Sequence, residues 1–160
     1  MEACIAEKRR GLPTRASVPY NRRMEHKCEI RVRSYECDGY GHVNNAVYLN
    51  YLEYARGEFL KAIGFDYPRA IASGYGLYVA RIELDYKTPA FPGDELSILS
   101  KPVKKGAVSG ILDQRVLRGE TIIAEAKVTW AFVNGSGQPT RIPADWNLSG
   151  LDPLGLTMLP

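Results

Sequence analysis

The sequence predicts a single α+β domain in which a curved antiparallel five-stranded sheet wraps around one long helix. One segment, residues 45–63, carries apolar side chains at helical spacing, whereas five others have the pattern of half-buried strands. Their order is strand, helix and four strands. Five strands make a sheet about 24 Å wide, and one helix is about 10 Å thick. The sheet must therefore curve to bury its apolar face on the helix.

The first predicted strand ends near Tyr35, and the long helix follows it. In the strand, Cys28, Ile30 and Val32 alternate with charged residues. The helical stripe consists of Tyr48, Leu52, Ala55, Phe59 and Ile63. Asn44 is the predicted N-cap and Gly64 the predicted C-terminal stop. At about 1.5 Å per residue this helix is close to 28 Å long.

Four further strands are predicted after the helix. Two of them, residues 78–86 and 122–132, have an apolar residue at every second position, opposed by polar residues such as Arg81, Glu83, Glu125 and Lys127. Residues 96–104 and 107–118 supply the other two, and Arg118-Gly119-Glu120 predicts a tight hairpin connection. These strands complete the predicted antiparallel sheet.

Composition limits the function classes. The chain has 160 residues, of which 45% are apolar and 24% charged, as in an ordinary globular domain. No apolar run approaches the roughly 20 residues that span a bilayer. The formal charge of +3 comes from scattered Lys and Arg residues, which argues against a nucleic acid partner. Three cysteines without metal-ligand spacing predict reduced thiols in a cytoplasmic protein and no metal site.

The two ends of the chain lack the periodicity of the middle. Residues 1–25 are basic and predict a flexible N-terminal arm without the apolar core of a signal peptide. Whether this arm is a targeting segment stays open. Residues 147–160 are interrupted by Gly and Pro and predict an irregular tail. The folded domain is therefore expected over residues 26–146.

Asp38 lies in a turn, Asp38-Gly39-Tyr40-Gly41, directly ahead of the long helix. Most Asp-Gly pairs only turn the chain. The start of a helix, however, presents unsatisfied backbone N–H groups with a partial positive charge. Such donors can hold an oxygen that becomes negative, and an ionised carboxylate can attack a carbonyl or accept a proton from water. The juxtaposition predicts a hydrolytic site.

The turn belongs to a longer set of motifs. The first is Arg33-x-Tyr35-Glu36-x-Asp38-x-x-Gly41-His42-Val43-Asn44-Asn45-x-x-Tyr48, followed by Glu53-x-Ala55-Arg56. Downstream stand Tyr86-Lys87-Thr88-Pro89-Ala90-Phe91-Pro92-Gly93-Asp94-Glu95-Leu96 and Gly137-Gln138-Pro139-x-Arg141-Ile142-Pro143. Over roughly residues 26–146, the chain resembles hotdog-fold acyl-CoA thioesterases of the 4-hydroxybenzoyl-CoA thioesterase type.

This resemblance implies an enzyme that hydrolyses an acyl thioester of coenzyme A, or of acyl carrier protein, without a metal or organic cofactor. It also implies a homodimer or homotetramer with active sites at the subunit interface. Asp38 matches the catalytic carboxylate of the family, and Asn45 matches the residue whose backbone N–H polarises the thioester carbonyl. Whether Asp38 attacks the carbonyl or activates water stays open.

Substrate contacts are expected from residues around the turn and from one strand connection. Tyr40, His42, Asn44 and Tyr48 are candidates for the pocket. The two tyrosines, like Tyr51, could equally belong to the core, and Asn44 could only cap. His42 is alternatively a general base or a residue that fixes the loop.

Lys104 and Lys105 form a second group of candidates. They stand where the family often has basic residues that meet the phosphates of coenzyme A, although solvated lysines are common at strand turns.

Several alternatives remain beside this interpretation. Cys37 could be a nucleophile, but a structural thiol is the commoner case. Glu53 could be a second site carboxylate, although Glu53 and Arg56 at i, i+3 predict an ion pair. At the level of function, the alternatives are a non-catalytic acyl-thioester binding protein and a hotdog hydratase or dehydratase.

Overall fold

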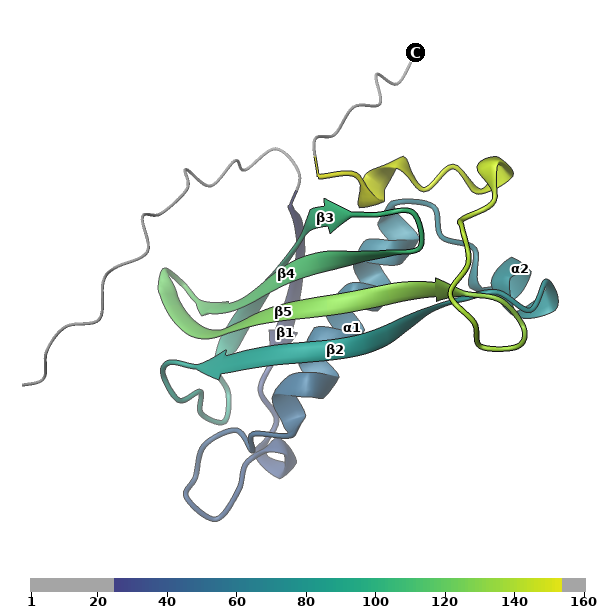
Figure 1. Ribbon diagram of the computed structural model, residues 1–160. Coiled ribbons are helices and arrows are strands. Elements are labelled where there is room, and N and C mark those ends of the chain that lie inside the picture. Colours follow the sequence, from purple (N-terminus) through teal and green to yellow (C-terminus); the bar gives the residue numbers. More distant parts are fainter. Residues whose placement is uncertain (1–24, 154–160) are drawn as a thin grey trace, which may run out of the picture.

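The computed structural model describes residues 25–153 and confirms the predicted α+β architecture, a five-stranded antiparallel sheet around one central helix (Figure 1). The strand order is β1-β3-β4-β5-β2. The strands are β1 (His26–Arg31), β2 (Gly76–Tyr86), β3 (Glu95–Lys105), β4 (Ser109–Arg118) and β5 (Thr121–Val133). The helices are α1 (Val47–Ala62) and α2 (Tyr67–Ala72), with 3-10 turns η2 (Ser34–Glu36), η3 (Ala144–Trp146) and η4 (Ser149–Leu151).

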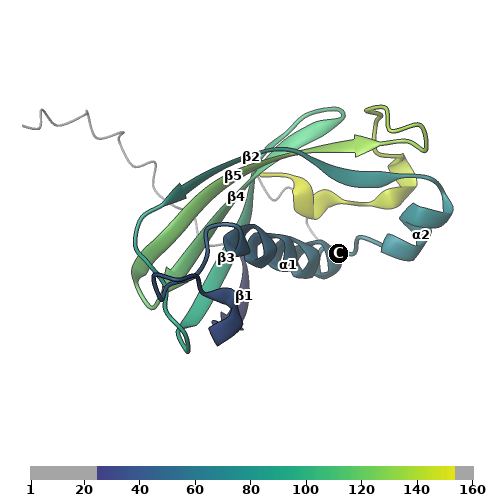
Figure 2. The ribbon, with the colours of Figure 1, turned by 90° about the horizontal axis from the view of Figure 1, so that it is seen from below.

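The sheet curves over α1, which lies along its concave face (Figure 2). Alternation along the strands sends one set of side chains inward, where Ile98, Val116 and Val128 are fully buried. Leu52 and Ala55 of the predicted helical stripe are also fully buried. The apolar side chains of the strand pattern and those of the helix pattern therefore pack together in one core.

The helix α1 begins later than its pattern suggests. Asn44 does not occupy the N-cap position, because Ala46 does, and the Asn44 side chain instead accepts a hydrogen bond from the Ala46 N–H at 2.9 Å. Asn44 thus caps a turn that leads into the helix. The C-terminal stop is confirmed: Gly64 has φ +84°, and its N–H donates to the Lys61 carbonyl oxygen at 3.0 Å.

The predicted hairpin at Arg118-Gly119-Glu120 is also present, with Gly119 at φ +59° between β4 and β5. The short helix α2 was not predicted from the sequence. Its signals are Asp66, whose side chain accepts a hydrogen bond from the Arg69 N–H at 2.9 Å, and a proline in the first turn. Six residues are too few to display a helical period.

The segment after Trp146 is irregular apart from η4, yet it packs on the core. Leu148 is 4% exposed and Leu151 1% exposed. At the other end, Glu25 forms an ion pair with Arg115 at 3.5 Å. Residues 1–24, most of the predicted arm, and residues 154–160, the second half of the predicted tail, lie outside the described residues. The predicted domain boundaries stay a prediction.

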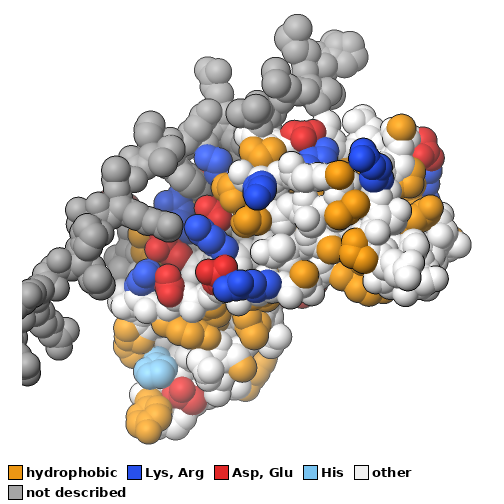
Figure 3. Space-filling view, in the orientation of Figure 1, with side chains coloured by type: hydrophobic (Ala, Val, Ile, Leu, Met, Phe, Trp, Pro, Cys, Tyr) orange, Lys and Arg blue, Asp and Glu red, His pale blue; other side chains and the backbone are white. Residues whose placement is uncertain are grey.

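The convex face of the sheet carries charges of both signs. Figure 3 shows acidic and basic side chains intermixed over one part of this face. Asp113 and Lys127 are neighbours here in the β4–β5 register. Among the described residues, no helix is both long and apolar enough to cross a bilayer.

Candidate active site

Asp38 lies at the beginning of a small hairpin between η2 and α1. Cys37 and Val43 pair as an antiparallel bridge, and the Asp38 N–H donates to the His42 carbonyl oxygen at 2.9 Å. The Gly41 N–H closes the turn on the Asp38 carbonyl oxygen at 3.0 Å. Gly41 has φ +79°, which glycine adopts without a steric cost. The local sequence thus fixes the backbone of the predicted catalytic residue.

Glu36 joins this hairpin to the helix. Its backbone carbonyl accepts from the Asn44 N–H at 3.0 Å, and its carboxylate accepts from the Tyr51 hydroxyl and the Arg33 N–H, each at 2.7 Å. Glu36 is only 9% exposed. Burial opposes ionisation, but the hydrogen bonds outweigh it and lower the pKa of Glu36. Burial and the Glu36 carboxylate raise the pKa of Tyr51, which therefore stays a hydrogen-bond donor.

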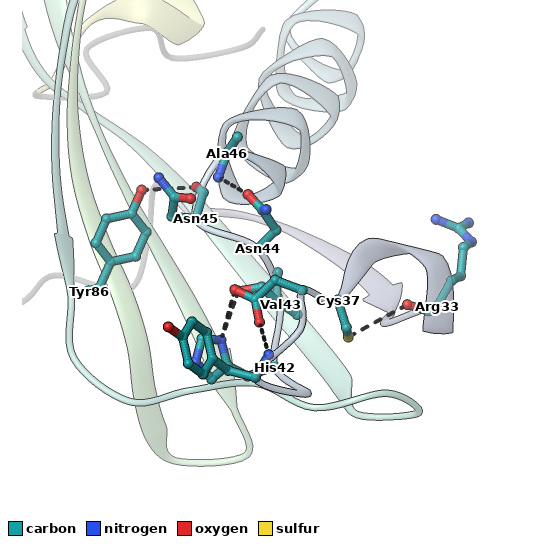
Figure 4. A network of polar contacts seen from close by, with 10 residues as sticks. Arg33, Cys37, His42, Val43, Asn44, Asn45, Ala46 and Tyr86 are labelled. Atoms are coloured by element: carbon teal, nitrogen blue, oxygen red, sulfur yellow. Dashed lines mark hydrogen bonds and ion pairs between the residues drawn. The ribbon is translucent and has the colours of Figure 1, made fainter.

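Asn45 presents its backbone N–H outward from the start of α1. The Asn44 carbonyl oxygen accepts from the Val47 N–H at 3.0 Å and so points into the helix. In a trans peptide the N–H points opposite to the C=O, so the Asn45 N–H points away from the helix. Within residues 25–153 this N–H has no acceptor. The Tyr86 hydroxyl donates to the Asn45 carbonyl oxygen at 2.9 Å and anchors the residue to β2 (Figure 4).

The Asp38 carboxylate is partly exposed and lightly bonded. One oxygen, Oδ1, accepts from the Tyr40 N–H at 2.9 Å, and Oδ2 lies 3.7 Å from His42 Nδ1. About a quarter of the side chain is open to solvent. A carboxylate in this setting keeps lone pairs free for an incoming carbonyl carbon or water molecule.

An open pocket of about 240 Å³ brings these groups together. It is lined by Asp38, His42, Val43, Asn45, Tyr48, Tyr86, Lys87, Thr88 and Pro89. The structure therefore unites four of the predicted site residues, namely Asp38, His42, Asn45 and Tyr48. Tyr40 lies outside the pocket, is 88% exposed and stacks on His42 with ring centroids 6.1 Å apart.

Lys104 and Lys105 do not reach this pocket within one chain. The Arg31 end of β1 pairs with Glu95 at the start of β3, next to the Asp38 hairpin. Lys104 lies nine residues farther along β3, about 30 Å away at strand geometry. The Lys105 ammonium pairs with Asp152 at 3.0 Å. Phosphate binding by these lysines stays a prediction that requires a second copy of the chain.

The structure disfavours a chemical role for the two alternative residues, Glu53 and Cys37. Glu53 pairs with Arg56, as predicted, and Arg56 also donates to Gln114 Oε1 at 2.9 Å. Burial, aided by the Glu36 and Asp38 carboxylates, raises the pKa of Cys37, which disfavours a reactive thiolate. Within the part of the chain that the structure describes, no cluster of three or more His, Cys, Asp or Glu residues is placed to hold a metal ion.

Two groups of pocket or support residues are not among the predicted site residues, although Tyr51 was expected in either the core or the pocket. Tyr86, Lys87, Thr88 and Pro89 line the pocket from the end of β2, and their signal was the downstream motif in which they stand. Glu36 and Tyr51 support the hairpin from beneath. Glu36 stands in the first motif, but no sequence signal shows that Tyr51 donates to it.

Comparison with known proteins identifies similar chains. Residues 32–148 match the family described as the thioesterase-like superfamily. The chain is 31% identical over 121 residues to the chloroplastic acyl-acyl carrier protein thioesterase ATL3 of Arabidopsis thaliana, covering 74% of this chain and 64% of that protein. It is 35% identical over 108 residues to the long-chain acyl-CoA thioesterase FadM of Escherichia coli, covering 66% of this chain and 81% of FadM.

A solved structure extends the likeness to three dimensions. A probable thioesterase from Bartonella henselae superposes with a TM-score of 0.69 at 31% identity, covering 74% of this chain and 99% of the other. The chain spans only 64% of the length of ATL3.

Proposed function

Because the chain belongs to the thioesterase-like superfamily, we propose that it hydrolyses an acyl thioester of coenzyme A, or of acyl carrier protein, to a free acid and a thiol. One observation carries the proposal. The Asp38 carboxylate and the unbonded Asn45 N–H belong to residues that line one open pocket at the start of α1. Acyl transfer needs a base or nucleophile, here the carboxylate, and a hydrogen-bond donor that stabilises the oxyanion.

The Asn45 N–H holds the thioester oxygen and stabilises the negative charge that develops when the carbonyl carbon becomes tetrahedral. In one route the Asp38 carboxylate attacks this carbon, the C–S bond breaks, and water then hydrolyses the mixed anhydride. In the other, Asp38 accepts a proton from water, hydroxide attacks, and the thiolate leaves with that proton. Both routes need an Asp38 oxygen open to the substrate; within residues 25–153, Oδ2 accepts no hydrogen bond and has only the 3.7 Å contact with His42 Nδ1.

We also propose a homodimer formed through β2. This eleven-residue strand lies at the edge of the sheet, and Tyr78, Val79 and Tyr86 on it are 62%, 43% and 51% exposed. The unpaired backbone N–H and C=O groups of an exposed edge strand are a template for pairing with another chain, and these three side chains add apolar area to the edge. Native mass in solution tests the assembly, and Tyr78→Lys should shift it toward the monomer. A wild-type monomer would contradict this part of the proposal.

We propose a reducing compartment, and the state of the cysteines supports this. Cys28 and Cys37 are free cysteines, which fits a reducing compartment such as the cytoplasm. ATL3 is chloroplastic by name. Location of the tagged chain in cells distinguishes the two.

The experiment is a panel of acyl-CoA and acyl carrier protein thioesters, with released thiol followed by a chromogenic reagent. Turnover of at least one thioester is the expected result. A hydratase or dehydratase would instead change the absorbance of an enoyl thioester, and a binding protein would bind thioesters without releasing thiol. Either outcome would overturn the proposed hydrolysis.

A further inference from the structure

The hydroxyl of Tyr86 is bonded to the residue that carries the proposed oxyanion donor. It donates to the Asn45 carbonyl oxygen at 2.9 Å, although the two residues are 41 positions apart in the chain. Tyr86 is 51% exposed, and water can bond an exposed hydroxyl nearly as well as a protein group does. The need to satisfy a buried hydroxyl is therefore not the reason for this bond.

The sheet and the core fix the position of the Tyr86 side chain. Its ring packs edge-on against Tyr48, with ring centroids 5.4 Å apart, and Tyr48 is only 4% exposed. The backbone of Tyr86 pairs with Ala124 of β5, and the following N–H, that of Lys87, donates to the Ile123 carbonyl oxygen at 2.9 Å. A group held on a paired strand is positioned more precisely than one on a loop.

Asn44 acts on the same segment from the helix side. Its side-chain Oδ1 accepts from the Ala46 N–H at 2.9 Å (Figure 4). Its carbonyl oxygen accepts from the Val47 N–H at 3.0 Å. The start of a helix has N–H groups without an intrahelical partner. Asn44 bonds two such groups and leaves the N–H of Asn45, which has no acceptor within residues 25–153, open to the pocket.

The two peptide groups that meet at Asn45 are both anchored. The peptide before it is held at the Asn44 oxygen by the Val47 N–H. The peptide after it is held at both ends, at its oxygen by the Tyr86 hydroxyl and at its N–H by the Asn44 side chain. Peptide groups are planar, so the chain turns only about φ and ψ between them. Anchoring both planes therefore fixes the direction of the Asn45 N–H.

We propose that Tyr86 and Asn44 are positioning residues, which hold the Asn45 N–H in the direction of the thioester oxygen; this inference rests on the proposed hydrolysis. Neither side chain has to touch the substrate in this role. An oxyanion donor stabilises the transition state most when it is oriented before the charge develops. Asn45 precedes the first residue of α1, and helix ends fray. The two side chains supply the restraint that helical hydrogen bonds do not give at this position.

The test for Tyr86 is the kinetics of Tyr86→Phe on the acyl thioester that wild type hydrolyses fastest. Phe keeps the ring on Tyr48 and removes only the hydroxyl. We expect kcat to fall about tenfold, less than the loss of about 100- to 1,000-fold on removal of an oxyanion donor. KM should stay within about twofold, because the change acts on the transition state. Tyr54→Phe, which removes a hydroxyl without a partner within residues 25–153, is the matched control and should keep the wild-type kcat.

Two unreactive analogues of the same thioester separate positioning from a general loss of structure. In the first, CF2 replaces the sulfur, so that the ketone adds water or the Asp38 carboxylate and becomes tetrahedral, with its oxygen at the Asn45 N–H. In the second, CH2 replaces the carbonyl group, so that no oxygen is present. Tyr86→Phe should weaken binding of the first analogue about as much as it lowers kcat/KM, and binding of the second by less than about twofold. Equal weakening of both overturns the positioning role.

Asn44 is tested by a pair of substitutions at a residue that does not line the Asp38 pocket. Asn44→Ala removes the acceptor of the Ala46 N–H and should lower kcat about tenfold, as Tyr86→Phe does. Ser can accept from the N–H two residues ahead, more weakly than Asn, so Asn44→Ser should stay within about threefold of wild type. An Asn44→Ala variant of wild-type kcat, or equal losses in the two variants, contradicts the role of Asn44.

The remaining outcomes separate this inference from the other proposals. Tyr86 lies on the edge strand of the proposed homodimer, so the native mass of Tyr86→Phe is compared with that of wild type and should be the same. A smaller mass would place the effect in assembly and overturn the assignment. A kcat equal to that of Tyr54→Phe, or a loss confined to KM, overturns it while hydrolysis stands. If wild type releases thiol from no thioester, the proposed hydrolysis itself is wrong.

Discussion

Replacing Tyr51 by Phe removes one hydrogen bond beneath the Asp38 hairpin without changing the shape of the core. The Tyr51 hydroxyl donates to Glu36 Oε2 at 2.7 Å, and Tyr51 and Glu36 are 4% and 9% exposed. A hydrogen bond to a charged group contributes about 1.5–3 kcal/mol. We therefore expect the free energy of unfolding to fall by about 2 kcal/mol at pH 7. For a chain of this size that lowers Tm by about 4–8 °C.

The pH dependence identifies the cause. The folded-state pKa of Glu36 is lowered, so the stability that its ionised form contributes is present above its unfolded pKa and is lost as the pH falls through the folded value. Below about pH 4, the difference between wild type and Tyr51→Phe should shrink toward the roughly 1 kcal/mol of a neutral hydrogen bond. Urea unfolding followed by circular dichroism between pH 3 and 7 measures both.

Tyr54→Phe provides the control, because Tyr54 lies on the same helix with 53% exposure and no hydroxyl partner among the described residues. It should be within about 0.5 kcal/mol of wild type, as surface substitutions usually are. A Tyr51→Phe variant as stable as Tyr54→Phe, or a deficit independent of pH, would refute the reasoning. The loosened hairpin should also lower kcat more than it raises KM, since Asp38 is positioned through Glu36.

Two further substitutions test the charges away from the hairpin. If Lys104 binds the carrier phosphates, Lys104→Ala should raise KM for acyl-CoA more than it lowers kcat. This increase in KM should become smaller in added salt. An equal loss of activity on a short thioester without the nucleotide would contradict the assignment. Asp113→Asn should leave hydrolysis unchanged and keep or raise Tm at pH 7. Burial raises the pKa of Asp113, so its ionised form costs stability above that pKa; a clearly lower Tm would contradict this.

The sequence predicted the architecture because its apolar patterns extend over long elements and lie on one face of each. In the eleven-residue β2 and the thirteen-residue β5, apolar residues recur at every second position along the strand. In α1, one apolar stripe extends over four turns. The short elements were not predicted, since α2 has six residues and η4 has three. The predicted start of α1 was early because the Asn44 side chain caps a preceding turn.

The candidate site also has one part that the sequence predicts and another that it does not. Asp38, His42, Asn45 and Tyr48 are close in the chain, so a single loop and the start of one helix bring them together. Tyr86 meets them only because β2 returns to that end of the sheet, a contact 41 residues away in sequence. The hydrogen bond between Glu36 and Tyr51 depends on side-chain packing that no local pattern reveals.

The most direct test of the catalytic role of Asp38 compares two Asp→Asn substitutions in the same assay. Both side chains accept a backbone N–H at 2.9 Å, Asp38 from Tyr40 and Asp66 from Arg69, but only Asp38 lines the pocket at the start of α1. Asp38→Asn should reduce thiol release at least about 100-fold while the protein stays folded, the lower range for positioned acid–base catalysis. Asp66→Asn should keep wild-type activity, since Asn caps a helix as well as Asp does. Activity of Asp38→Asn within a few-fold of Asp66→Asn would remove Asp38 from the mechanism.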